Sequence, residues 1–165
     1  MTEQSTPAPS MPTLQPINVQ IGLGAQYIKD FSFESPSAPQ IFAHMQTQPQ
    51  LSIDVNVLSR GGADGSFESI LKIKLESKLG EKTAFIAELA YAGLFMLPPQ
   101  LSEEQIKLFL LVEAPRLLFP FARAIIANAI HEGGFPNIVI QPIDFMALYA
   151  SQRDKLGSML TAGAA

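Results

Sequence analysis

The sequence predicts an α+β fold: a four-stranded antiparallel sheet with helices packed on one face. Two patterns lead to this prediction. Four segments between residues 27 and 91 alternate apolar and polar side chains with a period of two, which is typical of antiparallel strands that are buried on one side. A helix-start signal and helical spacing follow from residue 102 onward. The length of 165 residues suits one domain with a substantial core.

The strand pattern is clearest in the third segment, where apolar residues alternate with lysines and glutamates. The predicted strands span residues 27–34, 51–58, 67–79 and 83–91. Glycine-containing turns at 61–65 and 80–82 separate the last three strands, which predicts a meander. The connection 35–50 is long and contains prolines, so we expect it to cross over part of the fold.

The helical region begins at Ser102, which forms a capping-box pattern with Gln105. We expect Pro115 and Pro120 to break or kink this helix. The segment 117–130 is apolar nearly all round, so one side should face the sheet and the other a second subunit. The predicted oligomer interface consists of Leu118, Phe121, Ile125, Ile126 and Ile130.

The ends of the chain differ from its middle in composition. Residues 1–16 are rich in Pro, Thr, Ser and Gln, which predicts a disordered N-terminal arm. One folded domain is predicted at 17–152, and it ends in a short helix that Asp144 caps and that carries Phe145, Leu148 and Tyr149. Residues 153–165 are predicted to be a flexible C-terminal tail.

The composition favours a protein that hides or uses apolar surface. Hydrophobic residues make up 47% of the chain and charged residues 16%. The most apolar window, 108–130, contains charges and prolines, which argues against a membrane-spanning helix, and the N-terminus lacks a signal-peptide pattern. We therefore expect a cytoplasmic protein. A net charge of −4 without a basic patch argues against nucleic acid as a partner.

The sequence shows no catalytic or cofactor-binding pattern. The chain has no cysteine, and His44 and His131 belong to no metal-binding motif. Gly22 and Gly24 begin a dinucleotide-like pattern that lacks its third glycine. We therefore predict a protein that is not an enzyme and that needs no cofactor or metal.

The carboxylates of the first strand are more informative. Strict alternation places Tyr27, Lys29, Phe31 and Phe33 on one face, and Ile28, Asp30, Ser32 and Glu34 on the other. Asp30 and Glu34 are then roughly 13 Å apart along the strand. One interpretation is that Asp30 and Glu34 lie on an ordinary solvated strand face. The other applies if the first and fourth strands pair: Asp30, Glu34 and Glu88 then form an acidic patch around Ile28 and Ile86. Such a patch suits a basic partner.

Several motifs together resemble the SecB family of bacterial protein-export chaperones. The resemblance covers about residues 25–152 and rests on Tyr27-Ile28-Lys29-Asp30-Phe31-Ser32-Phe33-Glu34, Leu79-Gly80-Glu81, Pro115-Arg116-Leu117-Leu118-Phe119-Pro120-Phe121-Ala122-Arg123, Gly134-Phe135-Pro136 and Gln141-Pro142-Ile143-Asp144-Phe145. Each piece alone is short, but their order and spacing agree with the family.

The resemblance implies an ATP-independent holdase that binds unfolded precursor proteins and delivers them to the SecA motor. It also implies a homotetramer, built as a dimer of dimers through its helices. The SecA-binding positions would be Asp30, Glu34, Ile86 and Glu88. Candidate client-binding residues, which ordinary core packing would equally explain, are Leu51, Ile53, Phe135, Phe145 and Leu148.

The chain departs from the family at its ends. Many members end in an acidic tail, whereas this chain ends in Thr161-Ala162-Gly163-Ala164-Ala165. A contact between this tail and SecA is therefore in doubt. Two alternatives stay open: a carrier that binds a small apolar ligand on the half-open sheet, and a relative of SecB that serves a toxin–antitoxin system.

Overall fold

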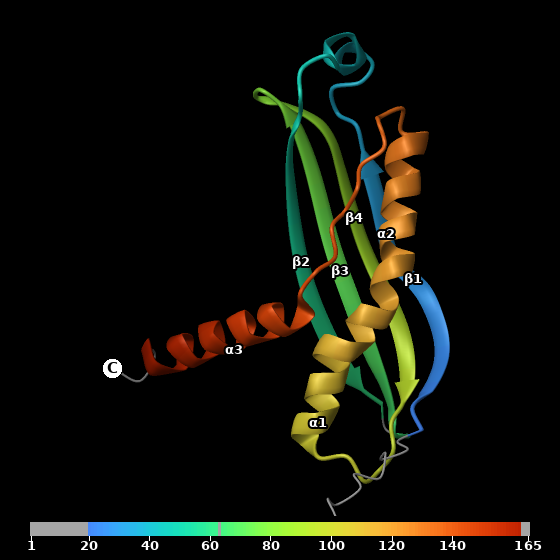
Figure 1. Cartoon of the computed structure of the whole chain (residues 1–165), viewed down its shortest axis with the longest axis vertical. Coiled ribbons are helices and arrows are strands. Elements are labelled where there is room, and N and C mark those ends of the chain that lie inside the picture. The colour runs from blue at the N-terminus through green and yellow to red at the C-terminus, as the bar shows by residue number, and fades with distance from the viewer. Residues whose placement is uncertain (1–19, 63, 163–165) are drawn as a thin grey trace, which may run out of the picture.

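The sheet has four antiparallel strands in the order β1-β4-β3-β2 (Figure 1). The computed structural model describes residues 20–62 and 64–162, so the predicted arm at 1–16 lies outside the described residues. The strands are β1 (Gly22–Glu34), β2 (Gln50–Gly61), β3 (Ser66–Leu79) and β4 (Lys82–Met96). Each is longer than predicted. The predicted meander of the last three strands is confirmed, and the first strand pairs with the fourth, which the sequence had left open.

Two glycines form the tight turns of the meander. Gly65 and Gly80 have φ angles of 77° and 61°, in the left-handed region where a side chain is strained. Gly80 lies in the short turn between β3 and β4, where Leu79 pairs with Lys82. Both turns lie where the sequence predicts them.

A bulge in β1 changes the predicted faces of this strand. The register shifts between Ile28, which lies opposite Tyr91, and Asp30, which lies opposite Ala90. Lys29 is the extra residue, and its side chain reaches Glu68. Glu68 lies on the face of the sheet that faces away from the described helices, which we call the open face; the other face is the helix side. The strict alternation predicted for 27–34 is therefore wrong at Lys29. Ile28 lies on the helix side, opposite the buried Tyr91, and not among the acidic residues.

One long helical segment packs against the helix side of the sheet. It consists of α1 (Glu103–Leu108), the π-helical turn η2 (Phe109–Glu113) and α2 (Ala114–Glu132). The capping box is confirmed, because the Ser102 side chain accepts from the Gln105 amide and the Gln105 side chain accepts from the Ser102 amide.

Pro115 and Pro120 were predicted to break or kink the helix: neither breaks it, because helical backbone continues through both, but a π-helical turn interrupts the regular α-helix just before Pro115. The π-helical turn lets the Ala114 amide bond to the Phe109 carbonyl, and Pro115 has no amide hydrogen to donate. The carbonyl of Leu110 would be left without an intrahelical donor. The buried Ser69 hydroxyl of β3 donates to it instead, at 2.7 Å. Pro120 lies on the exposed side of α2, where water can reach the freed carbonyl.

The core lies between α2 and the middle of the sheet. Leu118, Ala122, Ile126 and Ile130 recur every fourth residue of α2, and none of them is exposed. They belong to one apolar cluster with side chains of β3 and β4. Gly93 of β4 allows this close approach, because an added Cβ there would lie 2.9 Å from Leu118 Cδ2.

The connections and the last helix complete the fold. The crossover between β1 and β2 contains the short 3₁₀ helix η1 (Gln40–His44). After α2, the chain runs back along the helix side of the sheet to α3 (Phe145–Ala162), which projects away from the sheet (Figure 1). The Asp144 carboxylate accepts from the Ala147 amide, which confirms the predicted cap.

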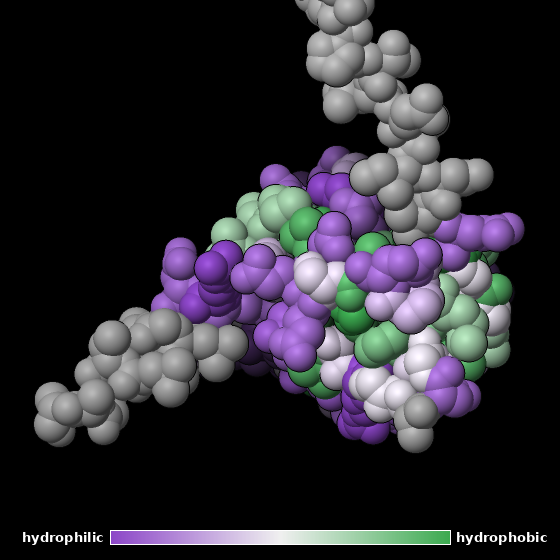
Figure 2. Space-filling view, turned by 90° about the horizontal axis from the view of Figure 1, so that it is seen from below, coloured by the Kyte–Doolittle hydropathy of each residue, from purple (hydrophilic) through white to green (hydrophobic). Residues whose placement is uncertain are grey.

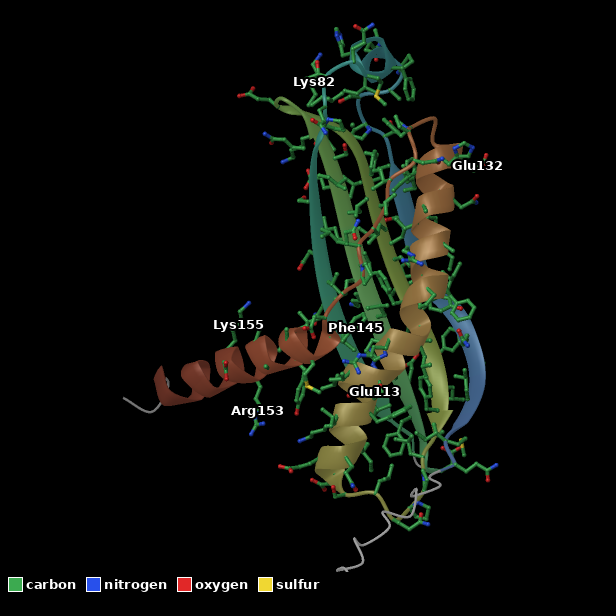
Figure 3. All side chains as sticks on the ribbon, viewed as in Figure 1. Lys82, Glu113, Glu132, Phe145, Arg153 and Lys155 are labelled. Atoms are coloured by element: carbon green, nitrogen blue, oxygen red, sulfur yellow. The ribbon has the colours of Figure 1, made fainter. Side chains whose placement is uncertain are left out.

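The last helix is longer than the short helix predicted from the sequence. It continues beyond 152 into the segment predicted to be a flexible tail, and residues 163–165 lie outside the described residues. Phe145 lies where α3 meets the sheet, and Arg153 and Lys155 lie on the projecting part (Figure 3).

Candidate interaction surfaces

Four side chains predicted to act together share the open face of the sheet. Glu34 lies opposite Ile86, and Ser32, two residues before Glu34, lies opposite Glu88. Asp30 lies opposite Ala90, two residues further along β4. Directly opposite residues in an antiparallel pair project to the same face with Cβ atoms about 5 Å apart. We call Asp30, Glu34, Ile86 and Glu88 the acidic strip.

A lysine already neutralises part of this strip. The Lys74 ammonium of β3 lies 2.9 Å from the Glu88 carboxylate, and both side chains are about half exposed. The hydrogen bond to Glu88 and its negative charge raise the pKa of Lys74. Solvent screens an exposed ion pair of this kind, so it contributes little free energy. A basic partner can therefore replace Lys74 at low cost.

A shallow hollow with a volume of about 240 Å³ lies beside the strip on the same face. Its lining includes both acidic and basic side chains, namely Asp30, Asp54, Lys72, Lys74 and Glu88. A hollow of this size and charge does not fit the floor of an apolar-ligand site.

A second charged cluster, at the bulge, was not predicted. The Glu68 carboxylate of β3 accepts from the Tyr27 hydroxyl at 2.5 Å and from the Lys29 ammonium at 2.6 Å. Burial alone would raise the pKa of Glu68, but the bonds from Lys29 and Tyr27 and the charges of Lys29 and Arg60 outweigh it, so this pKa is lowered. The same bond to Glu68 raises the pKa of Tyr27.

Edge strand β2 carries apolar side chains on the helix side that no helix covers. Leu51 and Ile53 are 46% and 47% exposed, so both are accessible to another polypeptide, and their role in client binding stays a prediction. Val57, further along the same strand face, is buried. The uncovered part of β2 is therefore the part that follows the crossover.

Two of the predicted client-binding residues belong to the core. Phe135 is 4% exposed and Phe145 1%, so neither offers surface to a client, and the prediction is corrected for both. The Phe135 ring packs against Phe85, with centroids 4.9 Å apart. Leu148 is half-buried against the core.

The sequence interpretation missed two exposed apolar residues on the helix side. Phe42 of η1 is 40% exposed, and its ring lies 5.2 Å from that of Phe135 beside a hollow of about 520 Å³. Val139, in the segment after α2, is 79% exposed. We call these four exposed apolar residues, Phe42, Leu51, Ile53 and Val139, the client surface, after the role predicted for Leu51 and Ile53. Single apolar residues in loops have no periodicity, so no sequence pattern marked them.

The predicted oligomer interface divides into two sets. Leu118, Ile126 and Ile130 lie wholly within the subunit's own core, so the prediction is corrected for these three. Phe121 is half exposed and Ile125 half-buried.

The exposed side of α2 continues onto β1. Leu117 and Phe121 are 51% and 52% exposed, and Phe121 stacks on Tyr91 with ring centroids 6.4 Å apart. Ile28, opposite Tyr91, is 51% exposed, and Phe31 is also exposed. We call Ile28, Phe31, Leu117 and Phe121 the α2–β1 surface.

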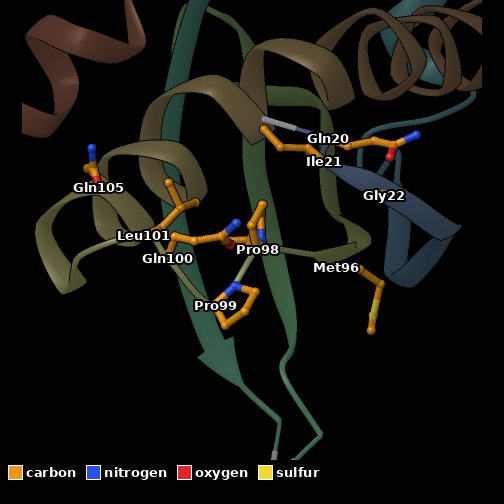
Figure 4. Close-up of a pocket in the computed structure, with 10 residues that line it drawn as sticks. Gln20, Ile21, Gly22, Met96, Pro98, Pro99, Gln100, Leu101 and Gln105 are labelled. Atoms are coloured by element: carbon orange, nitrogen blue, oxygen red, sulfur yellow. The ribbon is translucent and has the colours of Figure 1, made fainter. Parts of the chain in front are cut away.

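One larger hollow lies at the end of the sheet, where β1 begins and β4 ends. Its volume is about 940 Å³, and none of the described residues that line it has an ionisable side chain (Figure 4). Figure 2 shows this end of the molecule, where apolar and polar side chains are interspersed. Among the described residues, no three His, Asp or Glu side chains are close enough to hold a metal ion. No described helix is long and apolar enough to cross a membrane.

The sequence matches one family over most of its length. The family described as preprotein translocase subunit SecB matches residues 14–156. A protein-export protein SecB from Rhodospirillum centenum is 47% identical over 144 residues, which cover 87% of this chain and 86% of that protein. Another, from Rhizorhabdus wittichii, is 43% identical over 155 residues, which cover 94% and 92%.

A solved structure has the same fold. It is a SecB-like chaperone from Mycobacterium tuberculosis in complex with an antitoxin peptide, with a TM-score of 0.64. The likeness covers 74% of this chain and 90% of that one, and at 11% sequence identity it concerns the fold alone. The family match and the close relatives decide the assignment: this chain belongs to the SecB family of protein-export proteins.

Proposed function

We propose that the protein is an ATP-independent holdase that acts in the cytoplasm. It binds non-native precursor proteins, keeps them competent for translocation and delivers them to the SecA motor. The observation that carries this proposal is the client surface, where Leu51 and Ile53 are about half exposed on a member of a protein-export family. Exposed apolar surface of this kind is typical of a site that binds other polypeptides.

The client surface and the edge of β2 provide partners for the groups that an unfolded chain leaves exposed. Unfolded chains expose apolar side chains and unpaired backbone groups, and β2 is an edge strand of the sheet. A client segment can add to this edge by backbone hydrogen bonds while its side chains contact Leu51, Ile53 and Phe42. Backbone hydrogen bonds do not depend on the amino-acid sequence of the client, which suits a chaperone with many clients. Binding only the unfolded state delays folding by mass action and needs no nucleotide.

Assembly of several subunits would strengthen weak client binding. We propose a homotetramer, a dimer of dimers, that buries the α2–β1 surface between subunits. The support is the exposure of Leu117 and Phe121, which no element of the described subunit covers. Several client surfaces on one assembly raise avidity by roughly 10²–10⁴-fold without any new contact.

The acidic strip is the proposed contact with SecA. Asp30, Glu34 and Glu88 would attract a basic segment of SecA, and Ile86, opposite Glu34 at one end of the strip, would add an apolar contact. The strip lies on the open face of the sheet and the client surface on the helix side. The two functions therefore use different side chains.

Refolding of a slow-folding precursor tests the proposal. We expect excess protein to delay refolding in the absence of nucleotide, and the double variant Leu51→Asp/Ile53→Asp to shorten this delay. The single variants Leu51→Asp and Ile53→Asp are each compared with Leu108→Asp as the matched control, because Leu108 is 38% exposed on α1 and lies outside the client surface. An unchanged refolding rate at excess wild-type protein would contradict the proposal.

The alternative of a small-ligand carrier receives no support from the open sheet face. The hollow there is small and lined by charged side chains, including Asp30, Lys72 and Lys74. Burying an apolar ligand against them would desolvate charges.

A further inference from the structure

The bulge in β1 creates an electrostatic conflict at the acidic strip. Because the register shifts at Lys29, the side chains of Lys29 and Asp30 both project to the open face of the sheet. Their Cα atoms are about 3.8 Å apart along the chain. A flexible lysine so close to Asp30 could neutralise the carboxylate that a basic partner needs.

Glu68 binds the Lys29 ammonium at a position along the sheet that differs from that of Asp30. Glu68 lies opposite Leu94 of β4, whereas Asp30 lies opposite Ala90. Four residues along a strand span roughly 13 Å. The Lys29 side chain bound to Glu68 therefore extends along β1 toward the position opposite Leu94, away from the Asp30 carboxylate.

The surroundings of Glu68 keep this arrangement in place. The Lys29–Glu68 pair crosses over β4, and beneath it Ile70, Ala90 and Ala92 form a small buried cluster on a face that no helix covers. The Glu68 side chain is only 12% exposed. Tyr27 donates to the same carboxylate, and Arg60 lies opposite Glu68 on β2. Partial burial and several partners hold Glu68 better than an exposed pair would.

We propose that Glu68 is a positioning residue for the acidic strip: it holds Lys29 away from Asp30 and so keeps the strip available to a basic polypeptide. The inference rests on the proposed function of the strip. Glu68 itself makes no contact with the partner. Its loss would free Lys29 to pair with Asp30 while the fold and the client surface stay intact.

The first experiment measures the position of Lys29 without any partner. Acylation of lysine amines, followed by mass spectrometry, compares Lys29 in the wild type and in Glu68→Gln. We expect faster labelling of Lys29 in the variant, with Lys82, at the start of β4 and outside the hollow beside Asp30, as the internal reference. Equal labelling of Lys29 in both proteins would overturn the proposal, whatever the role of the strip.

The second experiment measures binding to SecA. We expect Glu68→Gln to weaken binding roughly two- to fivefold, the range typical of exposed charge pairs. Lys29→Met/Glu68→Gln should restore wild-type affinity because the competing ammonium is gone. The matched control, Arg60→Met/Glu68→Gln, has the same net charge but keeps Lys29, so it should stay weak. Equal rescue by both double variants would reduce the effect to net charge and overturn the proposal.

Two further readouts separate the possible failures. The refolding delay should be the same in all these variants, and a parallel loss of client binding would mean that Glu68 has a merely structural role. If Asp30→Asn leaves SecA binding unchanged, the proposed role of the strip is wrong. The labelling of Lys29 then still decides whether Glu68 holds it.

Discussion

At the scale of single residues, the strip depends on competition among charges. Glu88 already has a partner in Lys74 at 2.9 Å, so a basic partner exchanges one ammonium for another. Such an exchange changes specificity and association rate more than affinity. The strip is therefore best tested by reversing a charge, which adds repulsion to the loss of attraction.

We predict that Glu88→Lys weakens SecA binding by about tenfold or more, which is at least about 1.4 kcal/mol. Client binding should survive, because Glu88 lies on the open face and the client surface on the helix side. Calorimetric titration with SecA and the refolding assay give the two readouts. Glu132→Lys is the control, since it has the same charge change at the C-terminus of α2, where a positive charge is favourable. Equal losses of both activities would contradict the prediction.

Part of the site could be predicted residue by residue. Alternation alone grouped Asp30 with Glu34 and Ile86 with Glu88, because neighbours two apart share a strand face. The bulge at Lys29 could not be predicted, because it depends on the pairing with β4 and on Glu68, which is far away in sequence. The burial of Phe135 likewise depends on contacts with Phe33 and Phe85 of the sheet.

At the scale of elements, α2 separates a core face from an exposed face. The core face is the stripe of Leu118, Ala122, Ile126 and Ile130, and the other face carries Leu117 and Phe121. The sequence predicted that a helix apolar all round needs two partners. It did not say which residues face which partner, because that depends on how the helix is rotated on the sheet.

We predict that Phe121→Asp dissociates the assembly and leaves the subunit folded. Phe121 is half exposed in the subunit, so the charge is solvated there but would be buried in an interface. Light scattering should give a lower mass than for the wild type, with unchanged circular dichroism. Ile126→Ala is the contrasting variant: it should reduce the free energy of unfolding by about 2–5 kcal/mol because Ile126 is fully buried. A wild type that is already a single chain at micromolar concentration would refute the predicted interface.

The helix start could be predicted, but its continuation through Pro115 could not. Ser102 and Gln105 are three residues apart, so the capping box is local. The helix continues because Ser69, on a strand far away in sequence, donates to the carbonyl of Leu110. Local rules for proline do not include such a remote donor.

At the scale of the whole molecule, the two proposed partners are recognised by different forces. SecA would meet charges on the open face, whereas clients would meet apolar side chains and backbone on the helix side. Salt screens charges but does not weaken apolar burial. The overall fold could be predicted because strand periodicity, turn glycines and helix signals all agreed. The number of subunits follows only from the family resemblance and not from these patterns, because it depends on contacts that lie outside a single chain.

We predict that raising the salt concentration from 0.05 to 0.5 M weakens SecA binding and leaves the refolding delay nearly unchanged. The Debye length falls over this range to a few ångströms, about the distance between paired charges. Both assays are repeated at each concentration with the wild-type protein. A refolding delay that falls as steeply as SecA binding would indicate that charge also dominates client binding.

The placement of the acidic strip and the client surface on opposite faces of one sheet has a consequence for the transport cycle. With the proposed roles, neither partner would cover the surface of the other, so loading and docking would occur in either order through a ternary complex. Their coupling free energy would then be close to zero, because docking would change no contact that the client makes. Docking alone would not release the client. The work of release would have to come from the motor that pulls the client, and the chaperone itself would do no work on the chain.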